Sequence, residues 1–293
     1  MKTNNGSSRA YSITSILILI ILAILFLFPL YWILTGALKT PAAINSAVPQ
    51  WWPQEFTLRN FEVLFSKRSA PLFEIGSLTG PIIPGAIRWL INTVFMAVLA
   101  MLLTCITASL AGYALAKKRF AGRVILFSLI VAAMALPKQV ILIPLIKEMS
   151  ALGLYDNLWA VILPTVGWPF GVFLMKQFAE SIPGEMLEAA RIDGAGELRT
   201  FITVVYPMIK PGVGALAIFT FISSWNDYFL QLIMLTSSSN LTISLGIATM
   251  QAENSTDYGL IMAGAALAGP IIIVFLIFQK YFTKGITMGA VKG

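Results

Sequence analysis

The sequence contains no histidine, and its one cysteine, Cys105, lies inside a long apolar run. The absence of histidine excludes zinc sites of the usual His/Cys kind, triads that need a histidine base, and haem held by an axial histidine. A single cysteine cannot form a disulfide within the chain. Paired carboxylates with catalytic spacing are absent as well. We therefore expect no metal, no cofactor and no catalytic residue.

Charged residues are also scarce. They make up 11% of the 293 residues, against about 25% in soluble globular proteins. Hydrophobic residues make up 58%, in runs too long for a soluble domain. The net charge of +7 would suit nucleic acid, but the basic residues lie at the ends of the apolar runs and not on one polar face. The composition indicates a protein of the lipid bilayer that does not bind nucleic acid.

Several apolar runs are long enough to cross a bilayer, which takes about 20 mostly apolar residues. They cover residues 12–38, 86–116, 124–146, 157–175, 211–235 and 258–279. A cleaved signal peptide is the alternative for the first run. Its apolar core is too long for one, and no small-residue cleavage site follows cleanly. We expect an all-α, polytopic membrane protein with six transmembrane helices.

The remaining segments give the organisation and the orientation of the chain. We divide it into 1–11, the first span 12–38, a loop 39–85, a five-span core 86–281 and a tail 282–293. Most Lys and Arg residues fall at 1–11, 117–123, 176–210 and 280–292, whereas the short loops 147–156 and 236–257 hold only Lys147. Positive charge marks the cytoplasmic side. Both termini are therefore predicted to be cytoplasmic and the 39–85 loop external.

The most informative polar stretch is the segment 179–210 between the fourth and fifth spans, which we call the hairpin. It contains the string EAARIDGA and ends near Pro207 and Pro211. We expect a helix from Pro183 to about Ile192 that stops at Asp193-Gly194, because glycine readily takes the left-handed conformation at a helix end. A second short helix should then lead towards Pro207. An amphipathic connector without a partner is the alternative.

The hairpin resembles the cytoplasmic coupling motif of binding-protein-dependent ABC importers. The resemblance lies in an EAA string, a glycine after it and a later proline. It implies that a partner ATPase docks here, with Glu188, Arg191 and Asp193 offering charge to it and Ala189 and Ala190 leaving room for its approach. The residues that the resemblance assigns to ATPase coupling are Glu188, Ala189, Ala190, Arg191, Asp193 and Gly194.

The C-terminal string QKYFTKGITMGAVKG resembles the tail of carbohydrate-type permeases, close to the family of the maltose permease's second membrane subunit. In that subunit the tail reaches the interface of two ATPase subunits. The resemblance implies the type I ABC importer permease fold and the same contact for the tail, although a flexible basic tail is the alternative. The matching residues are Gly285, Gly289, Val291, Lys292 and Gly293.

The fifth span contains Trp225, Asn226 and Asp227. A carboxylate within a membrane costs a few kcal/mol on insertion scales, so it faces a cavity or a partner group. These residues either line a sugar pathway or form a polar clamp between helices. Proline and glycine at positions 137, 144, 164, 167, 169 and 171 interrupt the third and fourth runs, where kinks would serve either gating or static packing.

These patterns predict the membrane subunit of a sugar ABC importer in the bacterial inner membrane. The chain has no GxxxxGK[ST] phosphate-binding loop, so ATP hydrolysis must come from a partner. The resemblance implies a related second permease, two ATPase subunits and an external solute-binding protein that contacts residues 236–257. An ion-coupled secondary transporter is the alternative, but only Lys138 and Asp227 are clearly ionisable within the spans.

The long 39–85 loop suggests a bulky or extended oligosaccharide as the substrate. Three basic residues of this loop, and one that follows it directly, would tolerate an acidic sugar. The chain also has some similarity to permeases of alginate-oligosaccharide importers. The basic residues concerned are Arg59, Lys67, Arg68 and Arg88.

Overall fold

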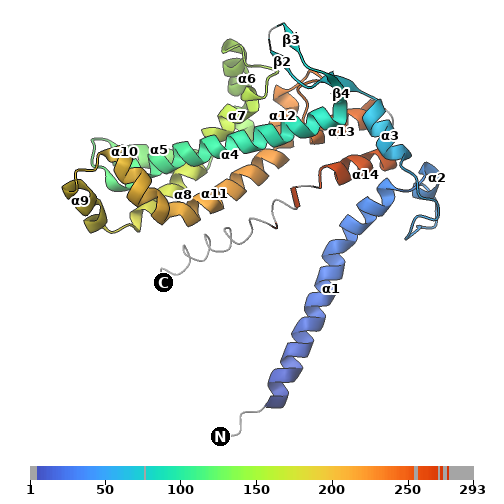
Figure 1. Ribbon diagram of the computed structural model, residues 1–293, viewed down its shortest axis with the longest axis horizontal. Helices are drawn as coiled ribbons and strands as arrows, with labels where there is room; N and C mark the ends of the chain where they lie inside the picture. The colour runs from blue at the N-terminus through green and yellow to red at the C-terminus, as the bar shows by residue number, and fades with distance from the viewer. Residues whose placement is uncertain (1–4, 76, 254–256, 270, 273–275, 277–293) are drawn as a thin grey trace. The chain divides into compact units, whose positions relative to one another are not determined.

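The structure is a computed structural model that describes residues 5–75, 77–253, 257–269, 271–272 and 276. The described chain is mostly helical and divides into two compact units (Figure 1). Unit 1 comprises residues 1–69, 84–86 and 247–268. Unit 2 comprises residues 70–83, 87–246 and 269–293. The two units are described separately.

Unit 1 is built around α1 (Asn5–Ala37), a helix whose apolar side chains are exposed over most of its length. It also holds α2 (Pro41–Ile44), α3 (Arg59–Ser66), most of α13 (Ile243–Glu253), and α14 (Tyr258–Leu267). α14 packs against α1 and α3. Because a Cβ on Gly264 would lie 2.6 Å from the Cδ1 atom of Ile247, glycine at this position of α14 permits close packing.

Unit 2 begins with two short pairs of strands that the all-α expectation did not include. Strand β1 (Ser69–Pro71) pairs with β4 (Ile82–Pro84), and β2 (Glu74–Ile75) runs antiparallel to β3 (Leu78–Thr79). The long helix α4 (Gly85–Lys117) follows, with its residues from 87 onward in unit 2. These strands lie in the segment that the sequence predicts to be a loop with short helical pieces.

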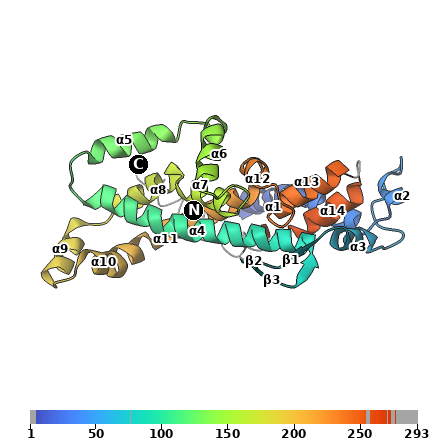
Figure 2. The ribbon, with the colours of Figure 1, turned by 90° about the horizontal axis from the view of Figure 1, so that it is seen from above.

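The rest of unit 2 is helical. The elements in chain order are α5 (Arg123–Ala133), the 3₁₀ turn η1 (Lys138–Ile141), α6 (Leu142–Ala151), α7 (Trp159–Val166), α8 (Pro169–Glu180), α9 (Gly184–Ile192), α10 (Glu197–Thr200), the π turn η2 (Phe201–Val205), α11 (Tyr206–Asn226) and α12 (Tyr228–Met234). Figure 2 shows α4 lying alongside α8 and α11.

The core of unit 2 lies where α4, α8 and α11 meet. A Cβ on Gly112 of α4 would lie 2.6 Å from the backbone nitrogen of Lys176 in α8, so the two backbones touch there. Close helix contact through small residues is the usual packing of membrane helices. The buried residues of this core are Ala108, Tyr113, Met175, Ala179, Ile182, Leu187, Phe201, Val205, Ile209, Val213 and Leu216.

Among the described residues, four helical stretches are long and apolar enough to cross a membrane. They cover Tyr11–Ala37, Gly85–Lys117, Trp159–Glu180 and Glu197–Asn226. A fifth span arises if α5 and the Lys138–Ala151 stretch, bent by 101° at their junction, are counted as one. The predicted sixth span, 258–279, is described as a helix over Tyr258–Leu267. Most of its remainder, and the whole 282–293 tail, lie outside the described residues.

The predicted third span is interrupted where the sequence indicates, because the chain turns at Met134–Pro137 and Pro137 precedes η1. The predicted bounds of the fifth span are wrong. The fifth was expected at 211–235, yet the helix runs from Glu197 to Asn226 and ends before Asp227. Pro207 lies inside this continuous helical stretch, just after the π turn η2 (Phe201–Val205). The π turn η2 joins α10 to α11 and ends at Val205.

Candidate functional site

The hairpin adopts the predicted helix–glycine–helix shape. α9 carries Glu185 in its first turn and Arg191 in its last, as the helix dipole favours. The helix ends in a Schellman motif, with Ala195 N–H donating to the carbonyl of Ala190 at 2.9 Å and Gly194 N–H to that of Arg191 at 3.0 Å. Gly194 has a φ of 75°, which favours glycine, and its missing Cβ would face open space.

Most of the predicted coupling residues are exposed on this hairpin. Exposed positions are Glu188, Ala189, Arg191, Asp193 and Gly194. Ala190 is buried within the chain, whereas Ala189 is exposed. That Ala190 leaves room for another protein surface stays a prediction.

Three apolar side chains on the hairpin were missed by the sequence reasoning. Ile192 is 86% exposed, Leu198 66% and Met186 44%. They lie on the same two helices as the exposed charges. A surface that combines exposed apolar side chains with charged ones has the composition of a docking site. In such a site, apolar anchors supply binding energy and charges supply selectivity. The signal in the sequence was an isoleucine and a leucine in an otherwise polar stretch.

Charged groups attach the hairpin to the C-terminal end of α4. Glu197 forms an ion pair with Lys118, accepts a hydrogen bond from the Tyr113 hydroxyl at 3.4 Å and lies 3.6 Å from the guanidinium of Arg191. Although burial acts to lower it, the hydrogen bonds and charges of Glu197 and Tyr113 leave the pKa of Lys118 above its usual value. Lys117 donates to the carbonyls of Glu180 and Ile182. These contacts tie α9 and α10 to α4.

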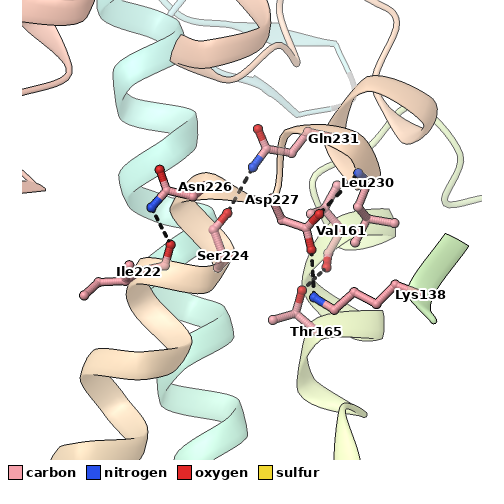
Figure 3. Close-up of polar contacts among 9 residues, drawn as sticks. All are labelled: Lys138, Val161, Thr165, Ile222, Ser224, Asn226, Asp227, Leu230 and Gln231. Atoms are coloured by element: carbon pink, nitrogen blue, oxygen red, sulfur yellow. Dashed lines mark hydrogen bonds and ion pairs between the residues drawn. The ribbon is translucent and has the colours of Figure 1, made fainter. Parts of the chain in front are cut away.

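A cavity of about 200 Å³ lies within unit 2. Its walls come from α4, η1, α6, α7, α8, α11 and α12, together with Trp168 and Asp227 between helices. Lys138 forms an ion pair with Asp227, with the ammonium nitrogen 3.0 Å from Oδ2 (Figure 3). The same nitrogen lies 4.8 Å from the centroid of the Trp168 ring. The sequence named Lys138 and Asp227 as isolated charges, and the fold makes them partners.

Of the three residues predicted in the fifth span, Asp227 alone lines the cavity. Its Oδ1 accepts the N–H of Leu230 at 3.4 Å and so caps α12. Trp225 is buried, with its ring 5.6 Å from that of Phe221. The Asn226 amide donates to the carbonyl of Ile222 at 2.9 Å (Figure 3). The geometry therefore lets Asp227 act both as a clamp and as part of a cavity wall.

The other end of α4 holds the segment 236–243. The Trp89 indole donates to the carbonyl of Ser238 at 2.9 Å. The Asn92 amide donates to those of Ser239 and Leu241, each at 2.8 Å. The Thr93 hydroxyl accepts the N–H of Ile243 at 2.9 Å. Trp89, Asn92 and Thr93 are all buried.

Asp156 completes the hold on this segment. Its Oδ1 accepts the N–H groups of Thr236 and Ser237 at 2.7 and 2.9 Å, and its Oδ2 accepts the Ser237 hydroxyl. Although burial acts to raise it, these hydrogen bonds hold the pKa of Asp156 below its usual value. Asp156 has a φ of 59°, uncommon for a residue other than glycine. Among the described residues, no group of three or more His, Cys, Asp or Glu side chains could hold a metal ion.

Comparisons with known proteins agree on one family. The model of the family "Binding-protein-dependent transport system inner membrane component" matches residues 106–288. The chain is 32% identical, over the full length of both, to the arabinooligosaccharides transport system permease protein AraQ of Bacillus subtilis. It is 33% identical to the sulfoquinovosyl glycerol transport system permease protein SmoH of Agrobacterium fabrum, covering 91% of this chain and 89% of the relative.

A solved structure has the same fold. It is described as a bacterial ABC transporter involved in the import of the acidic polysaccharide alginate. The TM-score is 0.75 at 24% identity, covering 96% of this chain and 100% of the other.

Proposed function

We propose a mechanism for transport from one premise: this chain belongs to the family of binding-protein-dependent transport system inner membrane components. It is a multi-pass permease subunit of an ABC importer, with the type I permease fold. It is a transport subunit and not an enzyme. The ion-coupled alternative has no support.

The substrate is a sugar or oligosaccharide. Relatives that are 32% identical or more are named for the transport of arabinooligosaccharides, sulfoquinovosyl glycerol, and melibiose, raffinose and stachyose. These names share carbohydrate chemistry and differ in the sugar and in its charge. The substrate class, carbohydrate, follows from the chemistry that these names share.

The hairpin receives the movement of a partner ATPase. One observation carries this assignment. The hairpin exposes charged groups together with the apolar side chain of Ile192, and contacts of Lys117, Lys118 and Glu197 join it to α4. A partner that binds and shifts this unit would pull on a helix that runs the length of unit 2. ATP-driven closure of the ATPases would then move the spans between outward-open and inward-open states.

The remaining partners complete the importer. A second, related permease, two ATPase subunits and an external solute-binding protein would assemble with this chain in the inner membrane. Both termini would be cytoplasmic, with Gly289, Val291, Lys292 and Gly293 of the tail reaching the ATPases. The binding protein would contact the 236–257 region, whose first part is held rigidly by Asp156 and α4.

The test is Gly194→Pro, just past the C-terminal end of α9, matched by Gly184→Pro at the first position of that helix. Proline fixes φ near −65° and cannot adopt the left-handed conformation of Gly194, a conflict of about 3 kcal/mol. Gly184 follows Pro183 at the first position of α9, where proline is favoured. We expect Gly194→Pro to weaken ATPase association roughly 100-fold, the equivalent of that strain, while Gly184→Pro leaves it unchanged.

The measurement is co-purification of the ATPase subunits with each variant, followed by hydrolysis stimulated by the loaded binding protein in liposomes. Glu188→Lys, which reverses an exposed charge, should lower both readouts without affecting insertion. Wild-type association for Gly194→Pro and Glu188→Lys would show that the hairpin is only a connector.

A further inference from the structure

The cavity in unit 2 is small and partly polar. Its volume of about 200 Å³ lies below the about 300–1,000 Å³ of pockets that enclose drug-sized ligands. It therefore suits a single sugar ring and not an oligosaccharide. Aromatic rings form part of its wall, including Trp168 and the pair Phe170 and Phe219, whose centroids lie 4.6 Å apart. Apolar ring faces of this kind suit the C–H face of a sugar.

One buried hydroxyl in the wall lacks a protein partner. Thr104 of α4 is 3% exposed and lines the cavity, and within the described part of the chain its Oγ1 makes no hydrogen bond. That oxygen has almost no accessible surface, so neither water nor a ligand in the cavity touches it in this structure. Thr104 therefore contributes only carbon surface to the cavity wall.

The charges of the cavity wall cancel. Lys138 is the cation and Asp227 is the anion, and the two already neutralise each other at 3.0 Å. Their side chains are 46% and 15% exposed, so Asp227 is the more enclosed of the two. A hydroxyl group can accept from the ammonium and donate to the carboxylate, and so it fits both members of the pair. A carboxylate on the ligand would be attracted by Lys138, but it would at the same time be repelled by the neighbouring carboxylate of Asp227.

We propose that this cavity binds one uncharged sugar ring of the transported substrate and that Asp227 rejects a ring bearing a carboxylate. The proposal rests on the sugar-import function given above. At this site it excludes the acidic sugars that the basic residues around the first loop would tolerate. Trp168 and Phe219 supply apolar faces, and Lys138 and Asp227 supply the polar contacts.

The test measures occupancy of the cavity directly. A cysteine at Ser223, which lines the cavity, is introduced with Cys105→Ala, and its rate of reaction with a maleimide is followed in the assembled complex without ATP or binding protein. The probes are glucose and galactose, each matched with its uronate at equal ionic strength. The control is a cysteine at Ser181, which is exposed at the end of α8.

We expect at least one neutral sugar to slow labelling at position 223 about twofold at half-saturation, by simple mass action, and its uronate to give no protection. Labelling at position 181 should not change. Equal protection by a sugar and its uronate, protection at both positions, or no protection by either neutral sugar would overturn the proposal. Because no ATP is present, failure here is distinct from failure of the coupling assignment.

Two variants locate the selectivity. Asp227→Asn retains an oxygen that can cap α12 but removes the charge. Because this removes a like charge within hydrogen-bonding reach of the ligand, the preference for the neutral sugar over its uronate should fall at least about tenfold. Thr104→Val, nearly the same shape, should leave protection by the neutral sugar unchanged, because the Thr104 hydroxyl is enclosed. An unchanged preference in Asp227→Asn would contradict the role of Asp227, even if Thr104→Val behaves as expected.

Discussion

The two ends of α4 hold two polar segments by different chemistry. At the C-terminal end, Lys117 and Lys118 bind the hairpin through charges that water reaches. At the N-terminal end, Trp89 and Asn92 bind the 236–243 segment through neutral hydrogen bonds that are buried. Exposed ion pairs contribute about 0–1 kcal/mol. A buried carbonyl that loses its donor costs about 1–3 kcal/mol. One end can exchange partners at little cost, and the other end is fixed.

This difference suits the two tasks proposed for these ends. A docking surface for an ATPase that binds and shifts in each cycle needs contacts that can be remade within the cycle. A surface offered to an external protein gains affinity when it is held in one conformation beforehand. Figure 1 shows the hairpin helices α9 and α10 at one extremity of α4. The contacts of Trp89 and Asn92 place the 236–243 segment at the other extremity.

The largest effect should come from Asn92→Leu, matched by Lys118→Met at the other end of α4. Leucine keeps the shape of asparagine but leaves the carbonyls of Ser239 and Leu241 without the Asn92 donor. We expect a loss of about 1–3 kcal/mol for each carbonyl, seen as a drop of several degrees in Tm of the purified complex. Lys118→Met, which removes the exposed ion pair with Glu197, should cost about 1 kcal/mol or less. Equal losses at the two ends would break the comparison.

A smaller, pH-dependent effect should come from Asp156→Asn. Asparagine tolerates the left-handed backbone at this position, so the change removes mainly the charge. Hydrogen bonds lower the pKa of Asp156 in the folded protein, so its stabilisation is present above the unfolded-state pKa of about 3.9 and is lost as pH falls through the folded-state pKa.

We therefore expect Asp156→Asn to lower stability by about 1 kcal/mol at neutral pH, with the deficit shrinking as pH falls below about 4. Thermal unfolding at a series of pH values measures this deficit. A deficit that is constant with pH would mean that the charge of Asp156 does not hold the segment.

The smallest effect on stability should come from Glu197→Gln in the hairpin. Glu197 accepts hydrogen bonds from Lys118 and Tyr113 and forms an ion pair with Arg191, yet its side chain is 63% exposed. We expect a loss of about 0.2–1 kcal/mol at low salt, which disappears near 1 M salt, where screening acts over about 3 Å. Unfolding at the two ionic strengths is the measurement. A loss as large as that of Asn92→Leu, or one insensitive to salt, would show that both ends are equally fixed.

The sequence predicts the hairpin better than the cavity, for a physical reason. The position at which α9 ends depends on residues close together in the sequence, and Asp193-Gly194 is enough to predict it. The cavity depends on pairs such as Lys138 and Asp227, which lie 89 residues apart in the chain. Composition placed both charges within apolar runs but gave no sign that they meet. The burial of Ala190 was missed because the EAA string shows which residues are small, not which way they face.

The breaks in the helices show a similar limit. Pro137 marked the 101° bend in the third span correctly as an interruption, but a proline alone does not tell a kink from a reversal of direction. Pro207 and Pro211 suggested that a helix would start near them, and instead they lie inside a continuous helical stretch. Asp227 looked like a mid-span charge, although it separates α11 from α12. Capping and helix packing decided these boundaries.

The π turn η2 has a consequence for the angular phase of the hairpin. An α-helix advances about 100° for each residue, since a turn takes 3.6 residues. The wider turn at Phe201–Val205 accommodates an extra residue between α10 and α11. A chain shorter by one residue here would close the turn as ordinary α-helix. Every side chain of α10 would then rotate by about 100° relative to α11, turning Glu197 away from Lys118. The rotation of α10 relative to α11 therefore depends on the number of residues between Thr200 and Tyr206 as much as on their identity.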